Sequence, residues 1–197
     1  MVKDDTSFLQ KSLMSFSSMT LEDFSISEGL WQTKYYKKGE AYNSVRQVCK
    51  FLGFVEAGVF RTYHIEEKNG EEKNIFFYSA NQLVVSFASF INQVPCHYHT
   101  EAMTDAKVVF IHYDDLIHLY KTSHAWEHFG RILAEQASNI AFDRTESLLF
   151  QSAEMRYLNF VKQHPNLIND IPLYHISSYL GIQGPSLSRI RKRLLDK

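Results

Sequence analysis

The chain has 197 residues, 45% of them hydrophobic, enough to bury one medium-sized core and a smaller one. With 21 Lys and Arg against 22 Asp and Glu, its net charge of -1 excludes a generally polycationic protein. The charge is uneven, because residues 155–197 contain seven Lys and Arg and two Asp, a net +5, while the remaining residues carry a net -6. A basic end on an acidic body indicates that this end alone meets an anionic partner.

The cysteine content and the length of the apolar runs exclude further classes. Cys49 and Cys96 are too few for a disulfide framework or a thiolate metal site. No apolar run approaches the roughly 18 residues of a membrane-spanning helix, and the first residues lead into no signal-peptide core. We therefore expect a cytoplasmic protein without a membrane segment.

Residues 8–31 have the hydrophobic spacing of short helices, and from about residue 33 to 113 short aromatic and β-branched runs follow. Four runs show the alternation of strands: 59–65, 74–78, 83–87 and 107–112. Asn69-Gly70 suits a hairpin turn between two of them, since both residues tolerate positive φ. Short strands joined by turns predict an antiparallel sandwich, jelly roll or barrel.

Helical spacing dominates from about residue 115 to 164. Apolar residues at heptad-like spacing predict a dimer seam against a second copy of the chain; they are Trp126, Phe129, Leu133, Ala137 and Ile140. The same stripe also fits a helix that packs on its own β domain, and the pattern leaves both interpretations open. Phe142, Leu148 and Leu149 lie off this stripe and are available for packing within the chain.

Pro165 ends the helical region, and residues 166–172 are expected to form a loop. Two short amphipathic helices follow, joined by a turn at Gly181. Their apolar residues lie at helical spacing: Leu173, Ile176, Leu180, Leu187, Ile190 and Leu194. The opposite side of the second helix carries hydroxyl and cationic groups: Ser186, Ser188, Arg189, Lys192 and Arg193. One buried side and one such polar side suit entry into a DNA groove.

With these motifs in this order, the chain resembles the Crp/Fnr family of transcription regulators, and the resemblance covers nearly its whole length. It is most specific in residues 152–157 (SAEMRY), 176–182 (ISSYLGI) and 186–193 (SLSRIRKR), which look most like the Bacteroidetes-type branch. In the β domain it rests on strand and glycine spacing, with residues 54–58 and Arg61.

The resemblance implies an α+β fold: a jelly-roll-like antiparallel β roll of the cyclic-nucleotide-binding type, a long dimerisation helix and a small helix-turn-helix domain without a full wing. The corresponding domains are residues 1–122, 123–150 and 151–197. The implied DNA-binding residues are Gln183, Ser186, Ser188, Arg189, Lys192 and Arg193. Arg189 matches a family arginine that contacts DNA, whereas Lys192 and Arg193 would mainly neutralise phosphates.

Two departures from the family pattern indicate weaker or altered DNA reading. Pro185 stands where this branch usually has a glutamate that can accept from a cytosine amino group. Proline is tolerated in a first helical turn, so the helix itself is expected to form. The sequence ends at Lys197, so a β-hairpin wing behind the second helix is not expected.

The resemblance also bears on ligands. Responsive relatives carry a Gly-Glu pair and a later arginine that binds the cyclic phosphate, but residues 85–99 contain no Lys or Arg here. We therefore expect no response to cyclic AMP through the usual site. The register instead suggests a pocket for another effector, formed by Val85, Ser86, Cys96 and His97.

His97 and His99, followed by Glu101, are the best metal candidates, because residues at i and i+2 of a strand share one face. Further ligands at fixed spacing are missing, with His64 and His112 as the only candidate partners, so we predict no metal and no other cofactor. On a strand, Cys96 and His97 would face opposite sides and could not form a nucleophile–base pair, so no enzyme is predicted.

The sequence thus predicts a homodimeric regulator of transcription that binds a pseudo-palindromic DNA operator. RNA polymerase and an unidentified small-molecule effector are further candidate partners. The alternative is a β-roll protein that binds a small molecule or a metal and has lost DNA binding. A cupin-like metalloenzyme is the third interpretation.

Overall fold

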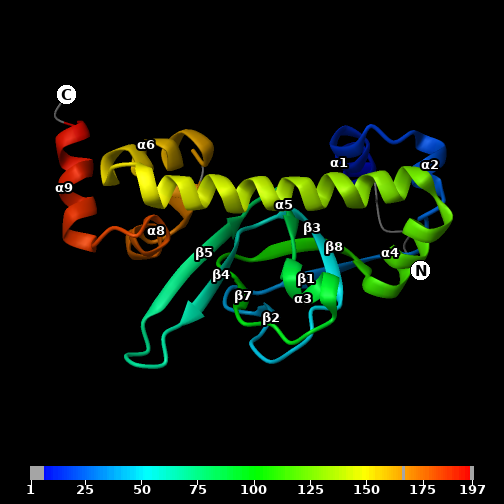
Figure 1. Ribbon diagram of the computed structural model, residues 1–197, viewed down its shortest axis with the longest axis horizontal. Helices are drawn as coiled ribbons and strands as arrows, with labels where there is room; N and C mark the ends of the chain where they lie inside the picture. Colours follow the sequence, from blue (N-terminus) through cyan, green and yellow to red (C-terminus); the bar gives the residue numbers. More distant parts are fainter. Residues whose placement is uncertain (1–6, 166, 196–197) are drawn as a thin grey trace.

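The computed structural model describes residues 7–165 and 167–195 and shows an α+β fold (Figure 1). An antiparallel β domain lies beneath one long helix, α5 (His124–Phe150). The N-terminal helices lie against one end of α5, and the C-terminal helices gather at its other end. This architecture confirms the predicted fold class, with its long helix and its helical C-terminal part.

The β domain consists of two four-stranded antiparallel sheets, with strand orders β1-β8-β3-β6 and β2-β7-β4-β5. The strands are β1 (Trp31–Tyr36), β2 (Ala41–Asn43), β3 (Phe51–Ala57), β4 (Phe60–Ile65), β5 (Glu72–Tyr78), β6 (Leu83–Val84), β7 (His99–Ala102) and β8 (Ala106–His112). As predicted, the segment with Asn69 and Gly70 turns the chain from β4 into β5, and Gly70 supplies the positive φ of 70°.

The first sheet has buried side chains on both of its faces, as β3 illustrates. Leu52 and Phe54 belong to the large core that the sheet shares with the helices. Val55, the next residue, points the other way and packs with Phe60 of the second sheet. Because successive strand residues face opposite sides, one strand connects the helical layer to the sheet-on-sheet core.

The remaining helices are α1 (Ser7–Ser17), α2 (Leu21–Ser25), α3 (Phe87–Asn92), α4 (Tyr113–Thr122), α6 (Ala153–Gln163), α7 (Leu167–Asp170), α8 (Leu173–Leu180) and α9 (Gly184–Leu195). Two predicted boundaries were wrong. The strand predicted over 83–87 ends at Val84, because α3 begins at Phe87. α7 occupies part of the expected loop. The helical region breaks at Ser123 and again at Ser152, which caps α6, and both breaks lie within two residues of the bounds expected for the long helix, 123 and 150.

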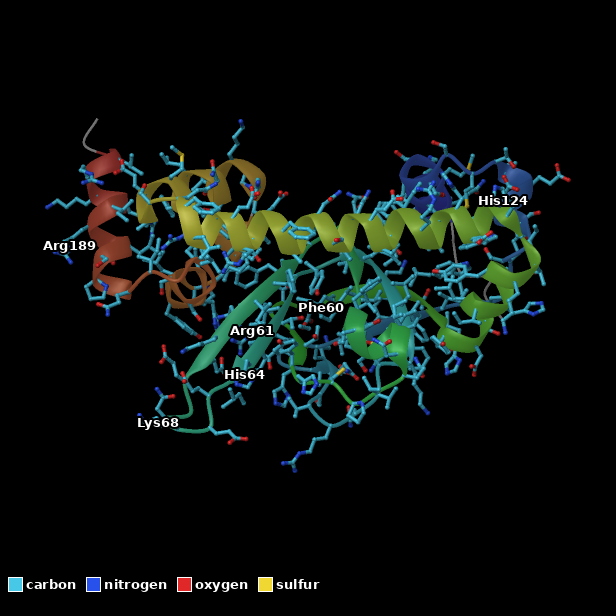
Figure 2. All side chains as sticks on the ribbon, in the orientation of Figure 1. Phe60, Arg61, His64, Lys68, His124 and Arg189 are labelled. Atoms are coloured by element: carbon cyan, nitrogen blue, oxygen red, sulfur yellow. The ribbon has the colours of Figure 1, made fainter. Side chains whose placement is uncertain are left out.

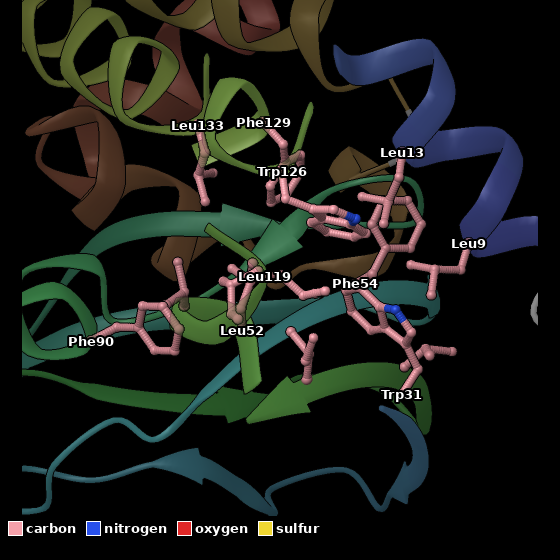
Figure 3. Packing of buried hydrophobic residues seen from close by; sticks show 14 of the residues in the cluster. Leu9, Leu13, Trp31, Leu52, Phe54, Phe90, Leu119, Trp126, Phe129 and Leu133 are labelled. Atoms are coloured by element: carbon pink, nitrogen blue, oxygen red, sulfur yellow. The ribbon is translucent and has the colours of Figure 1, made fainter. Parts of the chain in front are cut away.

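One face of the first half of α5 is buried in the chain's own core (Figure 3). Trp126 and Phe129 have 0% exposure and Leu133 has 7%. The Trp126 indole Nε1 also donates to the carbonyl oxygen of Asp23, at 2.9 Å. The predicted dimer seam is therefore wrong at Trp126, Phe129 and Leu133, because contacts with the N-terminal helices and the first sheet already cover these side chains.

The second half of α5 is mostly exposed. Ala137 is half-buried and Ile140 is 53% exposed. Phe142 and Leu149, which were available for internal packing, are each 68% exposed, so that expectation was wrong for both. Large apolar side chains gathered on an exposed helix usually mark a surface that another molecule covers.

Candidate nucleic-acid interface

The predicted pair of helices is present, with a tight turn between them. Gly181 ends α8 in the left-handed conformation, at φ +62°. The N–H of Gly181 donates to Ser178 O at 3.2 Å, and that of Ile182 donates to Ser177 O at 3.0 Å, which is the Schellman pattern. α9 then begins at Gly184, with Pro185 in its first turn as expected.

A small apolar core joins α8 and α9 to α6. Ile176, Leu180, Leu187 and Ile190 are buried, and Leu173 and Leu194 pack against them partly buried. Phe160 of α6 completes the contact surface. The apolar faces predicted for the two helices are therefore correct, and together they orient the polar side of α9 outward.

The polar side of α9 faces away from the rest of the chain. Its exposed residues are Ser188, Arg189, Lys192 and Arg193, and Gln183 is exposed just before the helix. Figure 2 shows Arg189 projecting from α9 at the end of the molecule opposite His124. The Arg189 guanidinium donates to the Oγ of the half-buried Ser186 at 3.3 Å and to Pro185 O at 3.4 Å. The structure thus brings the predicted DNA-binding residues together on one outward surface.

Arg193 differs from the other cations of this surface because it forms an ion pair with Glu154 of α6. The pair ties the last turns of α9 to the start of α6. The charge of Arg193 is therefore already compensated within the chain. For Arg193 to neutralise a phosphate, Glu154 would have to give up its partner or share it.

Two arginines bind the backbone carbonyl groups at the C-terminal end of α8. Arg156 of α6 donates to Leu180 O at 2.8 Å, to Gly181 O at 3.4 Å and to Gln151 O at 2.8 Å. Arg144 of α5 donates to Tyr179 O, and its guanidinium lies 4.0 Å from the centroid of the Tyr179 ring. Cations at a helix C-terminus satisfy its free carbonyls and its negative dipole end. The turn before α9 is thereby fixed to α5 and α6.

α8 also packs on the second sheet. The Oγ of Ser178 accepts from the Asn74 N–H at 3.0 Å and donates to Glu72 O at 2.9 Å. Phe77 of β5 contacts Tyr179, with ring centroids 5.2 Å apart. Phe77, Val59 and Met103 of the β domain belong to the same apolar cluster as the helices. Helix-pair spacing predicted the helices but not this docking, because it depends on contacts about a hundred residues apart along the chain.

The predicted effector-pocket residues occupy different environments. Val85 and Cys96 are buried in the large core, and His97 is exposed. Ser86 precedes α3, and its buried hydroxyl has no hydrogen-bond partner among the described residues. The two described hollows on the β domain, about 250 and 400 Å³, are lined by other residues. The pocket therefore stays a prediction.

The histidine pair has a different setting from the one predicted. β7 begins at His99, so His97 lies outside the strand and the two side chains do not share a strand face. His99 stacks on Tyr63, with ring centroids 5.3 Å apart. Among the described residues, no group of three or more His, Cys, Asp and Glu is placed to hold a metal. None of the described helices is long and apolar enough to cross a membrane.

The chain matches no protein-family model and no curated protein. Its fold is that of solved transcription regulators. FixK2 from Bradyrhizobium japonicum has a TM-score of 0.73 at 16% identity, over 84% of this chain and 85% of that chain. A protein from Eubacterium rectale that is assigned to the Crp/Fnr family has a TM-score of 0.69 at 17% identity, over 94% and 88%.

A third similar structure is the c-di-GMP-responsive global regulator CLP from Xanthomonas campestris, with a TM-score of 0.64 at 15% identity, over 89% and 90% of the two chains. Together these structures confirm the resemblance: the chain has the fold of Crp/Fnr regulators. The Bacteroidetes-type branch stays a prediction.

The Arg156 contacts lead to a first test. Arg156→Gln removes most of the hydrogen bonds to Leu180, Gly181 and Gln151, which should destabilise the turn by about 1–3 kcal/mol. Hydrogen exchange of the Gly181 and Ile182 amides should accelerate accordingly. Lys162→Gln, at an exposed cation of the same helix, is the matched control. Equal exchange in both variants would show that Arg156 does not hold the turn.

Proposed function

We propose that this protein is a sequence-specific DNA-binding regulator of transcription, related to the Crp/Fnr family and acting in the cytoplasm. The observation that carries the proposal is the α8–turn–α9 unit, with a buried apolar side and an exposed cationic side. A helix of this kind fits the major groove, while the DNA phosphates attract its cations. The fold shared with solved regulators supports the same function.

The proposed DNA-contacting residues are Gln183, Ser186, Ser188, Arg189, Lys192 and Arg193. Arg189 is best suited to read a base, because its planar guanidinium can bond both acceptors of a guanine edge. Its contact with Ser186 holds the side chain in place before DNA arrives. Lys192 supplies charge for the phosphates, as does Arg193 once it is released from Glu154.

The proposal includes a homodimer formed through the second half of α5, with the seam moved to another face. Arg144 and Leu148, which continue the originally predicted stripe, lie against the end of α8. Ala137 lies beside the exposed face and remains a candidate for its border, whereas Ile140, two positions before Phe142, lies on nearly the opposite side of the helix. The proposed seam consists of exposed residues three or four positions apart: Ala134, Ser138, Phe142, Thr145 and Leu149.

We further propose that the β domain does not respond to cyclic AMP through the usual site. The segment that would bind the cyclic phosphate, residues 85–99, contains no Lys or Arg. Cys96 stands where the register expects the arginine, and its buried Sγ is engaged by Asn43. Another effector would act by shifting the balance between orientations of the DNA-binding helices. RNA polymerase is a further proposed partner.

The proposed seam can be tested by placing a charge in it. Phe142→Asp puts one carboxylate from each copy into the interface and should weaken dimerisation by at least about tenfold. Sedimentation over a range of protein concentrations measures the change. Ile140→Asp, on nearly the opposite side of the helix, should have a clearly smaller effect. The reverse order of the two variants would place the interface on the side of Ile140 instead.

The DNA-binding face can be tested by reversing one charge. Arg189→Glu should lower affinity for a bound genomic fragment by more than about 100-fold, because a base contact is lost and a phosphate repulsion is added. Fluorescence anisotropy at two salt concentrations measures the affinity. Lys68→Glu on the distant β4–β5 hairpin (Figure 2) is the matched control and should bind almost normally.

Two outcomes of this assay would contradict the proposal. Unchanged binding by Arg189→Glu would refute the assigned face of α9. Failure of the unaltered protein to bind any genomic fragment at low salt, where phosphate contacts are strongest, would favour a ligand-binding protein without DNA binding.

A further inference from the structure

A buried arginine lies at the contact between the β domain and α8. Arg61 of β4 is 4% exposed. Its Nε and Nη2 donate to Glu101 Oε1 at 2.9 and 2.7 Å, and its Nη1 lies 2.6 Å from Glu72 Oε2. The Tyr63 ring covers one face of the guanidinium, 3.9 Å from the ring centroid. A buried cation needs such partners, and they leave it little freedom to move.

The next partner of Arg61 comes from α8, 114 residues along the chain. The Nδ1 of His175 lies 2.9 Å from Arg61 Nη1 and 3.2 Å from Asn74 Nδ2. Both neighbours are donors, so Nδ1 must accept, and the proton of the neutral ring is on Nε2. A protonated His175 would present a third donor to these two. The contact therefore exists only with the neutral imidazole.

The charged and titratable groups around this ring come from four elements: Arg61 of β4, Glu72 of β5, Glu101 of β7 and Tyr174 of α8 itself. Burial is the main cause that lowers the pKa of His175, and the Arg61 charge lowers it further. The two carboxylates oppose this effect but do not cancel it. The resulting pKa is about 4, so the docked ring is neutral at neutral pH.

We propose that Arg61 and His175 form a latch that holds α9 in one orientation on the β domain, which makes both of them positioning residues for DNA binding. The inference rests on the proposed function. The latch acts on α9 through α8 and the Gly181 turn, which Arg144 and Arg156 hold rigid. Figure 2 shows that Arg61 lies on the β domain, well away from Arg189.

Latching leaves the DNA-binding face open, because Ser188, Arg189 and Lys192 are exposed while α8 is docked. The docked arrangement is therefore able to bind DNA, and the latch reduces the number of orientations that α9 samples beforehand. A protein released from the latch has to restore one orientation when it binds, which lowers its affinity. Release of the latch should thus weaken DNA binding.

Protonation gives a direct way to open the latch. The pKa of His175 is about 4 when docked and the ordinary value near 6.5 when released, so protons favour the released form. The latch is fully effective above pH ~6.5 and weakens as the pH falls toward ~4. From these two values, the docking equilibrium constant should fall roughly 30-fold between pH 7.5 and 5.0.

His175→Gln separates the latch from other effects of pH. The Gln side chain retains an acceptor oxygen for Arg61 but carries no titratable group. The matched control is His164→Gln, at a histidine that lies beside Phe160 and away from Arg61. Docking is followed on the full chain without DNA, by NMR of the Asn74 amide, whose N–H donates to Ser178 Oγ.

The unaltered protein and His164→Gln should lose the docked Asn74 resonance progressively below pH ~6.5, whereas His175→Gln should keep it. DNA affinity is measured in parallel at constant salt. It should decrease as the pH is lowered in the same two proteins and stay nearly constant in His175→Gln. Equal pH profiles of the Asn74 resonance in all three would overturn the latch. A resonance that responds as expected while all three keep equal DNA affinities would overturn its positioning role.

The two parts of the experiment separate the latch from the proposed function. Absence of DNA binding by all three proteins at pH 7.5 contradicts the proposed function and the positioning role with it. The Asn74 resonance still decides, without DNA, whether His175 controls docking.

Discussion

A helix closes the open edge of the second sheet. β5 is the last strand in its sheet, and Ser178 of α8 satisfies the Asn74 N–H and the Glu72 carbonyl that another strand would otherwise bond. The position of α9 follows from this contact, because only the Gly181 turn separates it from α8. The orientation of the candidate DNA-binding surface is therefore determined by how the sheet edge is covered.

The long helix α5 supports the same placement of α9 and also leaves one face free for the proposed dimer. Its first half is part of the core through Trp126 and Phe129, so the helix has a defined direction across the β domain. Its second half supports the end of α8 through Arg144 and leaves Phe142 exposed on the other side. One helix thus contributes to the core, to the placement of α9 and, in the proposed dimer, to the contact between copies.

Local patterns predicted local structure well. The spacing of Ile176, Leu180 and Leu187, together with Gly181, predicted two helices, their buried faces and the turn, because those features depend on residues close in sequence. The β-branched run at 83–87 was misleading, since α3 begins within it. For Trp126, the spacing identified a buried face but could not say whether the same chain or a second copy covers it.

Such local patterns could not predict the contacts that place the C-terminal helices on the β domain. Arg61 and His175 are 114 residues apart. Arg61 entered the sequence analysis only as part of the family resemblance, and His175 does not stand out by spacing or composition. Arg156 belongs to the motif 152–157, which marked the start of the C-terminal helical part. The motif alone did not show that the Arg156 guanidinium binds the end of α8. Residues that join distant segments become visible only when the sheet and the helices are placed against each other.

Selection of bound fragments from genomic DNA by the purified protein tests the central claim most directly. A dimer that inserts two copies of α9 into successive major grooves predicts a shared pseudo-palindromic motif, with half-site centres one helical turn, about 34 Å, apart. Fragments without a shared motif, or with one unrepeated half-site, would contradict this account.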